Sequence, residues 1–488
     1  MKKEDPPASQ SKASLARLWY IGAALLIVSL GIGGWKVASQ ITQPAPTEEK
    51  VAVSHEIPKD TYIASKDIVY KFSGRDGSVL WTFALKQAYK PDRIIGSYLQ
   101  LAVVNDVVYA ALEYRIYALN ANTGKEIWQY SPKLTAAEQA QGHGRIAEMI
   151  VDKNFMYLQL VPGNMAALDL HDGSLKWSNL SFPNGGSFSA SDDTLYVSEF
   201  SRATGPLLHA IDGKTGKERW HFTRQFISIS TSTTFVSNGI VYSSGNPLYA
   251  LDARTGKQLW EQRLPAGPMY FDTLQIRNGV AYVNTSELAD FVARQTVSLD
   301  PYRIFAFDAQ TGKIQWESKP GYQLRDEVID GGKNLLVEDV LQEDAHLQAL
   351  DAMTGTQRWQ LALGTLSCDT SGSCSPQIGV SENHLYVLAR KRPYTLQIFD
   401  VQTGRSLGQH SIAIAAKEVL DLSLWSNGVL YTRSSLHEGD PYSSGSSTSF
   451  THYFIHTIRL ADGVTSWSHD LGSLLDVQVP ITKLLMGS

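Results

Sequence analysis

The sequence predicts an all-β protein, a β-propeller of four-stranded antiparallel blades that follows one transmembrane helix. A string made of an apolar strand, an acidic or polar residue, a Gly turn and usually a Trp recurs nine times between residues 69 and 467. Successive turn glycines are 40 to 59 residues apart, which is typical of propeller blades. Near the N-terminus, 18 uncharged residues follow Arg17, and this is the length of a membrane span.

The sequence divides the chain into four predicted parts. Residues 1–17 form a basic cytoplasmic tail, 18–36 a transmembrane helix, 37–59 a Pro-rich linker and 60–488 the propeller. Basic residues lie almost entirely before the apolar stretch, so we expect the N-terminus in the cytoplasm and the propeller outside the cell membrane. A cleaved signal peptide, cut near Val37-Ala38-Ser39, is the alternative reading.

Composition narrows the class of function. The 488 residues are 43% hydrophobic and 19% charged, with a net charge of −5, which is globular and gives no signal for binding polyanions. We therefore expect no nucleic-acid partner. With two cysteines, disulfides cannot be what holds the fold together.

The repeat is clearest in Leu248–Trp260, LYALDARTGKQLW. Its Asp252 can accept hydrogen bonds from the turn, and Gly256 supplies a positive φ. Trp260 is a large flat side chain suited to the gap between neighbouring blades. We expect turn or docking roles, and no catalytic role, for this set: Gly124, Trp128, Gly173, Trp177, Gly216, Trp220, Asp252, Gly256, Trp260, Asp308, Gly312, Trp316, Asp351, Gly355 and Trp359.

A second turn precedes each motif. Asn238-Gly239 and Asn278-Gly279 lie between alternating apolar runs, and such pairs favour type I′ hairpins with positive φ at both central residues. Each repeat therefore predicts four strands, A to D. The Asn-Gly type of turn joins A to B, and the Thr-Gly type of turn joins C to D.

The pattern A-x-D-x-x-T-G-K-x-x-W, best seen in Ala250–Trp260 and Ala306–Trp316, resembles the tryptophan-docking motif of the pyrroloquinoline quinone (PQQ) repeat family. The resemblance covers about residues 60–480 and implies an eight-bladed propeller. The nine motif copies also allow a propeller of nine blades. The first copy lacks a strand A, and residues 475–485 could supply it and close a ring of nine blades.

Loop lengths suggest where a partner would bind. The extra length falls in the B–C and D–A connections: Pro132–Arg145, Ser286–Arg303, Thr365–Pro376 and Ser434–His452. These connections share one face of a propeller, and loops on a rigid scaffold concentrate binding residues. We expect a non-catalytic scaffold that binds a protein or another cell-envelope component through this face.

Cys368 and Cys374 lie in one of these loops, and we expect them to form a disulfide that pins it in an extracytoplasmic location. Two thiolates with no His in the loop do not make a zinc site. We expect no metal ligands, no catalytic residues and no cofactor-binding residues.

Two alternatives to the scaffold remain. The resemblance includes PQQ-dependent dehydrogenases, which imply a disulfide between adjacent cysteines, a calcium or lanthanide site and a catalytic Asp. This sequence has no Cys-Cys pair, so we expect no PQQ. The chain is also similar in length and repeat type to the propeller subunit of outer-membrane protein assembly. That protein is a lipoprotein, whereas no Cys follows the apolar segment here.

Overall fold

A computed structural model describes the propeller part of the chain. The chain divides into two units, Met1–Thr47 and Glu48–Ser488, and all described residues lie in the second. These are residues 60–65, 67–74, 78–86, 99–182, 185–201, 205–224, 234–245, 247–264, 269–288, 299–330, 333–339, 346–363, 377–381, 383–389, 393–415, 418–426, 428–438, 450–475 and 485–486. The predicted tail, transmembrane helix, linker and the two cysteines lie outside them.

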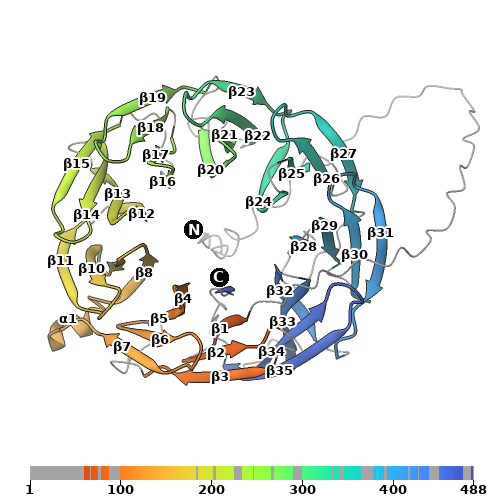
Figure 1. The fold of residues 1–488 in the computed structure, drawn as a ribbon, viewed down its shortest axis with the longest axis horizontal. Helices are drawn as coiled ribbons and strands as arrows, with labels where there is room; N and C mark the ends of the chain where they lie inside the picture. Colours follow the sequence, from red (N-terminus) through yellow and green to blue (C-terminus); the bar gives the residue numbers. More distant parts are fainter. Residues whose placement is uncertain are drawn as a thin grey trace, which may run out of the picture. The chain divides into compact units, whose positions relative to one another are not determined.

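The described strands form nine four-stranded antiparallel sheets, which follow one another around a ring (Figure 1). Blade 1 contains β1 (Thr61–Ser65), β2 (Ile68–Phe72), β3 (Val79–Ala84) and β36 (Leu485–Met486). Blade 2 contains β4 (Leu99–Val104), β5 (Val107–Leu112), β6 (Arg115–Asn120) and β7 (Glu126–Tyr130). Blade 3 contains β8 (Ile146–Val151), β9 (Phe155–Leu160), β10 (Asn164–Asp169) and β11 (Leu175–Ser181).

The next three blades repeat the same order. Blade 4 contains β12 (Gly185–Ser191), β13 (Thr194–Ser201), β14 (Gly205–Asp212) and β15 (Glu218–Thr223). Blade 5 contains β16 (Thr234–Ser237), β17 (Ile240–Ser243), β18 (Leu248–Asp252) and β19 (Gln258–Gln262). Blade 6 contains β20 (Met269–Arg277), β21 (Val280–Leu288), β22 (Leu299–Asp308) and β23 (Ile314–Glu317).

Three further blades complete the ring. Blade 7 contains β24 (Tyr322–Asp330), β25 (Asn334–Asp339), β26 (His346–Asp351) and β27 (Gln357–Ala362). Blade 8 contains β28 (Gln377–Ser381), β29 (His384–Leu388), β30 (Thr395–Asp400) and β31 (Ser406–Ser411). Blade 9 contains β32 (Val419–Ser426), β33 (Val429–Glu438), β34 (Phe450–Arg459) and β35 (Thr465–Leu475).

The expected number of eight blades is wrong, because every motif copy belongs to a complete sheet. Blade 1 has only three consecutive strands of its own, and β36 pairs with β1 as its innermost strand. The register places Thr61 opposite Met486 and Tyr62 opposite Leu485. The C-terminal strand β36 is therefore strand A of blade 1, as the nine-blade alternative proposes.

The core is divided among the blade interfaces. Among the described residues, one hydrophobic cluster occupies each of the eight consecutive interfaces from blade 1 to blade 9. Between blades 5 and 6, for example, Trp260, Tyr242 and Leu248 pack against Ala281 and Phe305. Burial of apolar surface between successive sheets therefore holds the ring together.

Tryptophan docking is the repeated contact at these interfaces. The indole Nε1 of Trp260 donates to the carbonyl of Ala309 in the next blade at 3.1 Å, and the ring lies against Gly312. The same bond links Trp81, Trp128, Trp177, Trp220, Trp316 and Trp359 to a carbonyl of the following blade, namely that of Ala121, Leu170, Gly213, Ala253, Ala352 and Val401.

The interface between blades 8 and 9 lacks this tryptophan, because Gly408 takes its position. Here Trp425 on β32 stacks on Tyr386 of blade 8, with ring centroids 6.0 Å apart. It also lies against Gly379, where a Cβ would stand 2.0 Å from its ring. A tryptophan from the innermost strand thus replaces the missing one from the outermost strand.

The Asn-Gly turns between strands A and B have the backbone conformation that the sequence predicts. Both central residues have positive φ in Asn238-Gly239, at 51° and 74°, and in Asn278-Gly279, at 48° and 76°. One helix, α1 (Ala136–Ala140), is described; it lies between β7 and β8 and begins with a capping box of Thr135 and Glu138. No helix within the described ranges is long and apolar enough to cross a membrane.

Candidate functional site

The acidic residues of the C–D turns make local hydrogen bonds to the turns that follow them. Asp252 Oδ1 accepts hydrogen bonds from the backbone N of Thr255 at 2.8 Å and from its hydroxyl at 2.6 Å. Asp308 binds Thr311 in the same way. Asp351 accepts from Thr354 N at 2.9 Å and from Arg358. These bonds hold the pKa of each carboxyl below its ordinary value.

The predicted glycines and tryptophans meet across the blade interfaces. Gly124, Gly173, Gly216, Gly256, Gly312 and Gly355 have φ between 67° and 71°, and each lies against the tryptophan of the preceding blade. The sequence did not show that each tryptophan docks on its neighbour's turn. The long loops expected to bind a partner lie mostly outside the described residues, with the exception of Pro132–Arg145.

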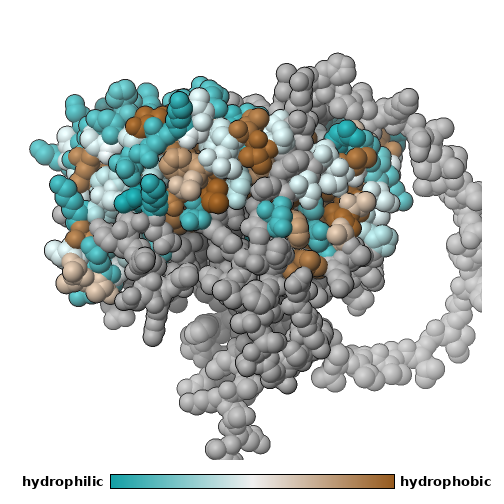
Figure 2. Space-filling model, turned by 90° about the horizontal axis from the view of Figure 1, so that it is seen from below, coloured by the Kyte–Doolittle hydropathy of each residue, from teal (hydrophilic) through white to brown (hydrophobic). Residues whose placement is uncertain are grey.

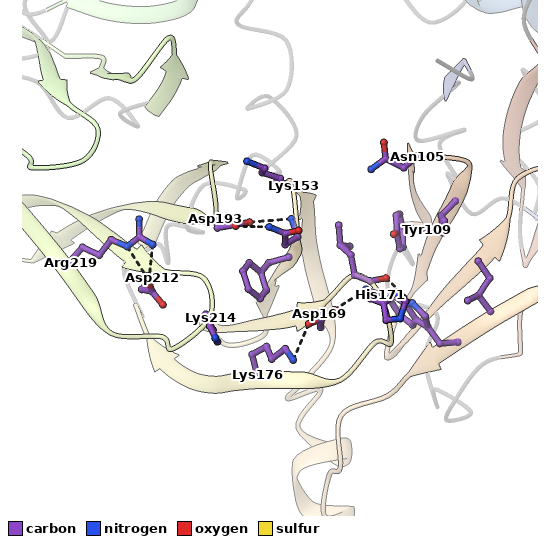
Figure 3. A pocket seen from close by; sticks show the side chains of 16 residues that line it. Asn105, Tyr109, Lys153, Asp169, His171, Lys176, Asp193, Asp212, Lys214 and Arg219 are labelled. Atoms are coloured by element: carbon purple, nitrogen blue, oxygen red, sulfur yellow. Dashed lines mark hydrogen bonds and ion pairs between the residues drawn. The ribbon is translucent and has the colours of Figure 1, made fainter.

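A pocket of about 820 Å³ lies on the opposite face, where the A–B and C–D turns of blades 2, 3 and 4 meet (Figure 3). The A–B turns contribute Asn105, Lys153, Asn154 and Asp193, and the C–D turns contribute Asp169, Leu170, His171, Asp212 and Lys214. The strands add Val107, Tyr109, Ile127, Trp128, Phe155, Lys176 and Arg219. This site was not foreseen, because the sequence assigned its turns a structural role.

The acidic side chains of the pocket already have partners in the chain. Asp169 pairs with Lys176 Nζ at 2.9 Å, and Asp212 pairs with Arg219 Nη2 at 2.7 Å. Asp193 accepts from Asn154 Nδ2 at 2.7 Å. The bond between Asn154 and Asp193 ties blade 3 to blade 4, whereas the two ion pairs lie within blade 3 and within blade 4.

Two lysines of the pocket, unlike Lys176 and Arg219, are not paired with an acidic residue in the described part of the chain. Lys153 and Lys214 are exposed, and the structure gives neither an ion pair with an acidic residue in its described ranges. Figure 3 likewise draws no contact from them to the other lining residues. The pocket therefore presents two cations that can receive anionic groups.

The carboxyls of the pocket are poorly suited to acid–base catalysis near neutral pH. Burial raises the pKa of Asp212, but hydrogen bonds from Arg219 and Thr215 outweigh it and lower the pKa to about 2. The hydrogen bond from Lys176 also lowers the pKa of Asp169. Both groups are ionised and occupied, whereas a general acid or base needs a pKa near the operating pH.

The lowered pKa of Asp212 predicts a pH dependence of stability. A depressed folded-state pKa contributes stability above the ordinary value of 3.8 and loses it as pH falls toward about 2. The difference in Tm between wild type and Asp212→Asn should therefore be greatest above pH ~4 and shrink toward pH ~2. Thermal unfolding between pH 2 and 7 measures it.

Gln310→Ala, an uncharged change in an exposed turn, is the control. Its difference in Tm from the wild type should not vary with pH. A constant difference for Asp212→Asn down to pH ~2 would contradict the assignment.

The resemblance to PQQ enzymes implies two adjacent cysteines and a cluster of side chains that binds a cation. The sequence has no adjacent cysteines to form the disulfide platform. Within the described part of the chain, no group of three or more His, Cys, Asp or Glu side chains could hold a metal ion.

A family model described as outer membrane protein assembly factor BamB matches residues 64–223, 163–289, 204–319 and 292–486. No curated protein matches the sequence. Among solved structures, BamB from Moraxella catarrhalis is 17% identical, with 68% of this chain and 92% of that chain covered and a TM-score of 0.43. Apo AztD from Citrobacter koseri is 13% identical, with 72% and 94% covered and a TM-score of 0.46. Quinohemoprotein alcohol dehydrogenase from Comamonas testosteroni is 13% identical, with 70% and 71% covered and a TM-score of 0.38.

The four family matches overlap and together extend across residues 64–486, which is most of the chain and all nine blades. They begin and end within the repeats that carry the tryptophan-docking motif. The protein is therefore a member of the PQQ-like repeat family described as outer membrane protein assembly factor BamB.

Proposed function

We propose that this propeller is a non-catalytic binding module of the cell envelope, anchored to the membrane by residues 18–36, that holds a protein partner. The observation that carries the proposal is the pocket between blades 2 and 4. Its carboxylates are engaged in fixed internal contacts, while Lys153 and Lys214 are available to a ligand. This arrangement suits binding better than catalysis.

The charge of the pocket indicates the kind of partner. Lys153 lies in an A–B turn of blade 3 and Lys214 in a C–D turn of blade 4, so an acidic segment laid across the two blades could contact both. A contact with one pocket is smaller than a stable protein interface, so the partner would extend over neighbouring turns. The family description, an assembly factor for outer-membrane proteins, supports a protein as the ligand.

Charge reversal at the two lysines tests the proposal. Lys153→Glu combined with Lys214→Glu should weaken partner binding about tenfold or more, because each change replaces an attraction with a repulsion. A photo-crosslinking residue placed at Lys214 identifies the partner in cells, and titration of the purified pair measures the affinity.

Arg254→Glu is the matched control, because Arg254 holds the same motif position in blade 5 as Lys214 holds in blade 4. It should leave binding unchanged and give no crosslink to the partner. Equal loss of binding in the control would mean that overall charge, and not this pocket, attracts the partner.

The face with the long B–C and D–A loops is the second candidate surface, as loop length alone suggests. The described part of it includes α1, in which Ala137 is exposed. Crosslinks from Ala137, with none from Lys214, would transfer the binding site to that face. Crosslinks from both positions to one partner would indicate two contacts.

The proposal also excludes PQQ as a working cofactor. PQQ titrated with calcium into the purified protein should produce no change in absorbance and no rise in Tm. A saturable response of either kind would favour the dehydrogenase-like alternative.

A further inference from the structure

The pocket of blades 2 to 4 has two unlike halves. The residue directly before the docked tryptophan lines it in all three blades: Ile127 in blade 2, Lys176 in blade 3 and Arg219 in blade 4. Lys176 and Arg219 each pair with the aspartate of their own turn. Ile127 is apolar and 49% exposed. The lining therefore changes from apolar at blade 2 to charged at blade 4, and Figure 3 shows Tyr109 at the first end and Arg219 at the other.

Two further side chains enlarge the apolar half. Leu170, in the C–D turn of blade 3, is half-buried and lines the pocket, as does Val107 at the start of β5. The docking bond from Trp128 uses the Leu170 carbonyl and requires no leucine side chain. The same motif position holds alanine in four other blades: Ala121, Ala253, Ala309 and Ala352. A single exposed apolar residue is ordinary, but three that line one pocket form a surface for an apolar group.

The charges of the other half nearly cancel. The lining contains four cations and three carboxylates, namely Lys153, Lys176, Lys214 and Arg219 against Asp169, Asp193 and Asp212. An exposed ion pair changes an affinity by about fivefold or less, whereas enclosing a side chain the size of leucine changes it by about tenfold or more. An acidic ligand that also uses the apolar half therefore binds more tightly than one that meets only the lysines.

Asn154 holds the two halves in a fixed relation. Its carbonyl accepts from the backbone N of Leu170 at 3.0 Å. Its own backbone N and its Nδ2 donate to the carboxylate of Asp193 in blade 4, at 3.1 and 2.7 Å. A ligand that spans both halves does not have to order them first, which lowers the entropic cost of binding.

We infer that the pocket recognises an acidic segment of a partner protein in which an apolar side chain lies next to a carboxylate. The apolar side chain packs against Ile127 and Leu170, and the carboxylates meet Lys153 and Lys214. The inference rests on the proposed function and deepens it, because two lysines alone accept any acidic chain. The order of the two halves also gives the segment a direction, with its apolar group toward blade 2.

Isothermal titration calorimetry of the purified full chain with unlabelled peptides tests the inference at low salt, where ion pairs are least screened. The probes are Gly-Ser-Asp-Leu-Asp-Ser-Gly and two relatives, one with Ala in place of Leu and one with Asn in place of both Asp. The Asp-Leu-Asp peptide should bind about tenfold more tightly than the Asp-Ala-Asp peptide. It should also bind more tightly than the Asn-Leu-Asn peptide.

Single variants assign each preference to its half of the pocket. Ile127→Ser and Leu170→Ala should each reduce the advantage of the Leu peptide and leave the Ala peptide unchanged. Leu170→Ala introduces the residue that four other blades have there, so it serves if the Ser variant does not fold. Leu259→Ser is the matched control, because Leu259 holds the motif position of Ile127 in blade 5 and is 47% exposed. It should bind all three peptides as the wild type does.

The outcomes separate this inference from the proposed function. Equal affinity for the Leu and Ala peptides, with both weakened by Lys153→Glu/Lys214→Glu, overturns the inference and leaves an acidic ligand for the pocket. Equal affinity for the Asp-Leu-Asp and Asn-Leu-Asn peptides, unchanged in the lysine variant, contradicts both. Absence of saturable binding of the Asp-Leu-Asp peptide in the millimolar range overturns the inference alone, because charge reversal measured on the crosslinked partner tests the proposed function independently.

Discussion

Trp260→Ala is expected to lower the free energy of unfolding by about 3–5 kcal/mol. The side chain is buried between blades 5 and 6, where it packs in the cluster that includes Tyr242 and Phe305. Its removal leaves a cavity against Gly312 and takes one of two hydrogen bonds from the Ala309 carbonyl, which keeps the bond from the Tyr242 hydroxyl. Denaturant unfolding followed by tryptophan fluorescence and circular dichroism measures the loss.

Two variants separate the causes of that loss. Trp260→Phe keeps most of the ring and loses the bond to Ala309, so it should cost clearly less than Trp260→Ala. Leu259→Ala changes the adjacent side chain, which is 47% exposed, and should stay within about 0.5 kcal/mol of the wild type. A cost for Trp260→Ala as small as that of Leu259→Ala would refute docking as a main source of stability.

Gly312→Ala is expected to destabilise the propeller by more than the backbone conformation alone requires. With φ at 71°, any alanine there is strained, by about 1–2 kcal/mol. Its Cβ would also stand 2.5 Å from Cδ2 of Trp260, and such overpacking adds about 1–3 kcal/mol. Unfolding curves of the single and double variants measure both terms.

Gly279→Ala isolates the backbone term, because Gly279 has φ of 76° and no atom within 4 Å of an added Cβ. It should cost less than Gly312→Ala. In the double variant Trp260→Ala/Gly312→Ala the clash disappears, so the two losses should sum to more than the double variant loses. Strict additivity would show that the ring and the glycine do not interact.

The blades were predictable because each carries its own local signals. The Asn238-Gly239 hairpin and the Asp252 to Gly256 turn depend on residues that are close in sequence, and both have the expected backbone conformations. The number of blades was not predictable in this way. A strand of two residues, Leu485–Met486, has no periodicity to read, and it is defined only by pairing with β1 across the whole chain.

The candidate sites depend on contacts that no local pattern reports. Lys153 and Lys214 are ordinary turn residues, and they share a pocket only because successive blades set their turns side by side. Arg224 looks like any basic residue after a strand, yet it is buried and donates a hydrogen bond to Ser243 of blade 5. Trp425 likewise replaces a tryptophan that the motif placed on a different strand.

The pairing of β36 with β1 has a consequence for the order of synthesis. Blade 1 draws three strands from one end of the propeller and its innermost strand from the other. Blades 2 to 9 can each assemble as their own residues emerge, but blade 1 is complete only after its last strand has been synthesised. Completion of blade 1 is therefore the final step of folding during synthesis, and a chain that stops before residue 485 would leave the inner edge of β1 unpaired.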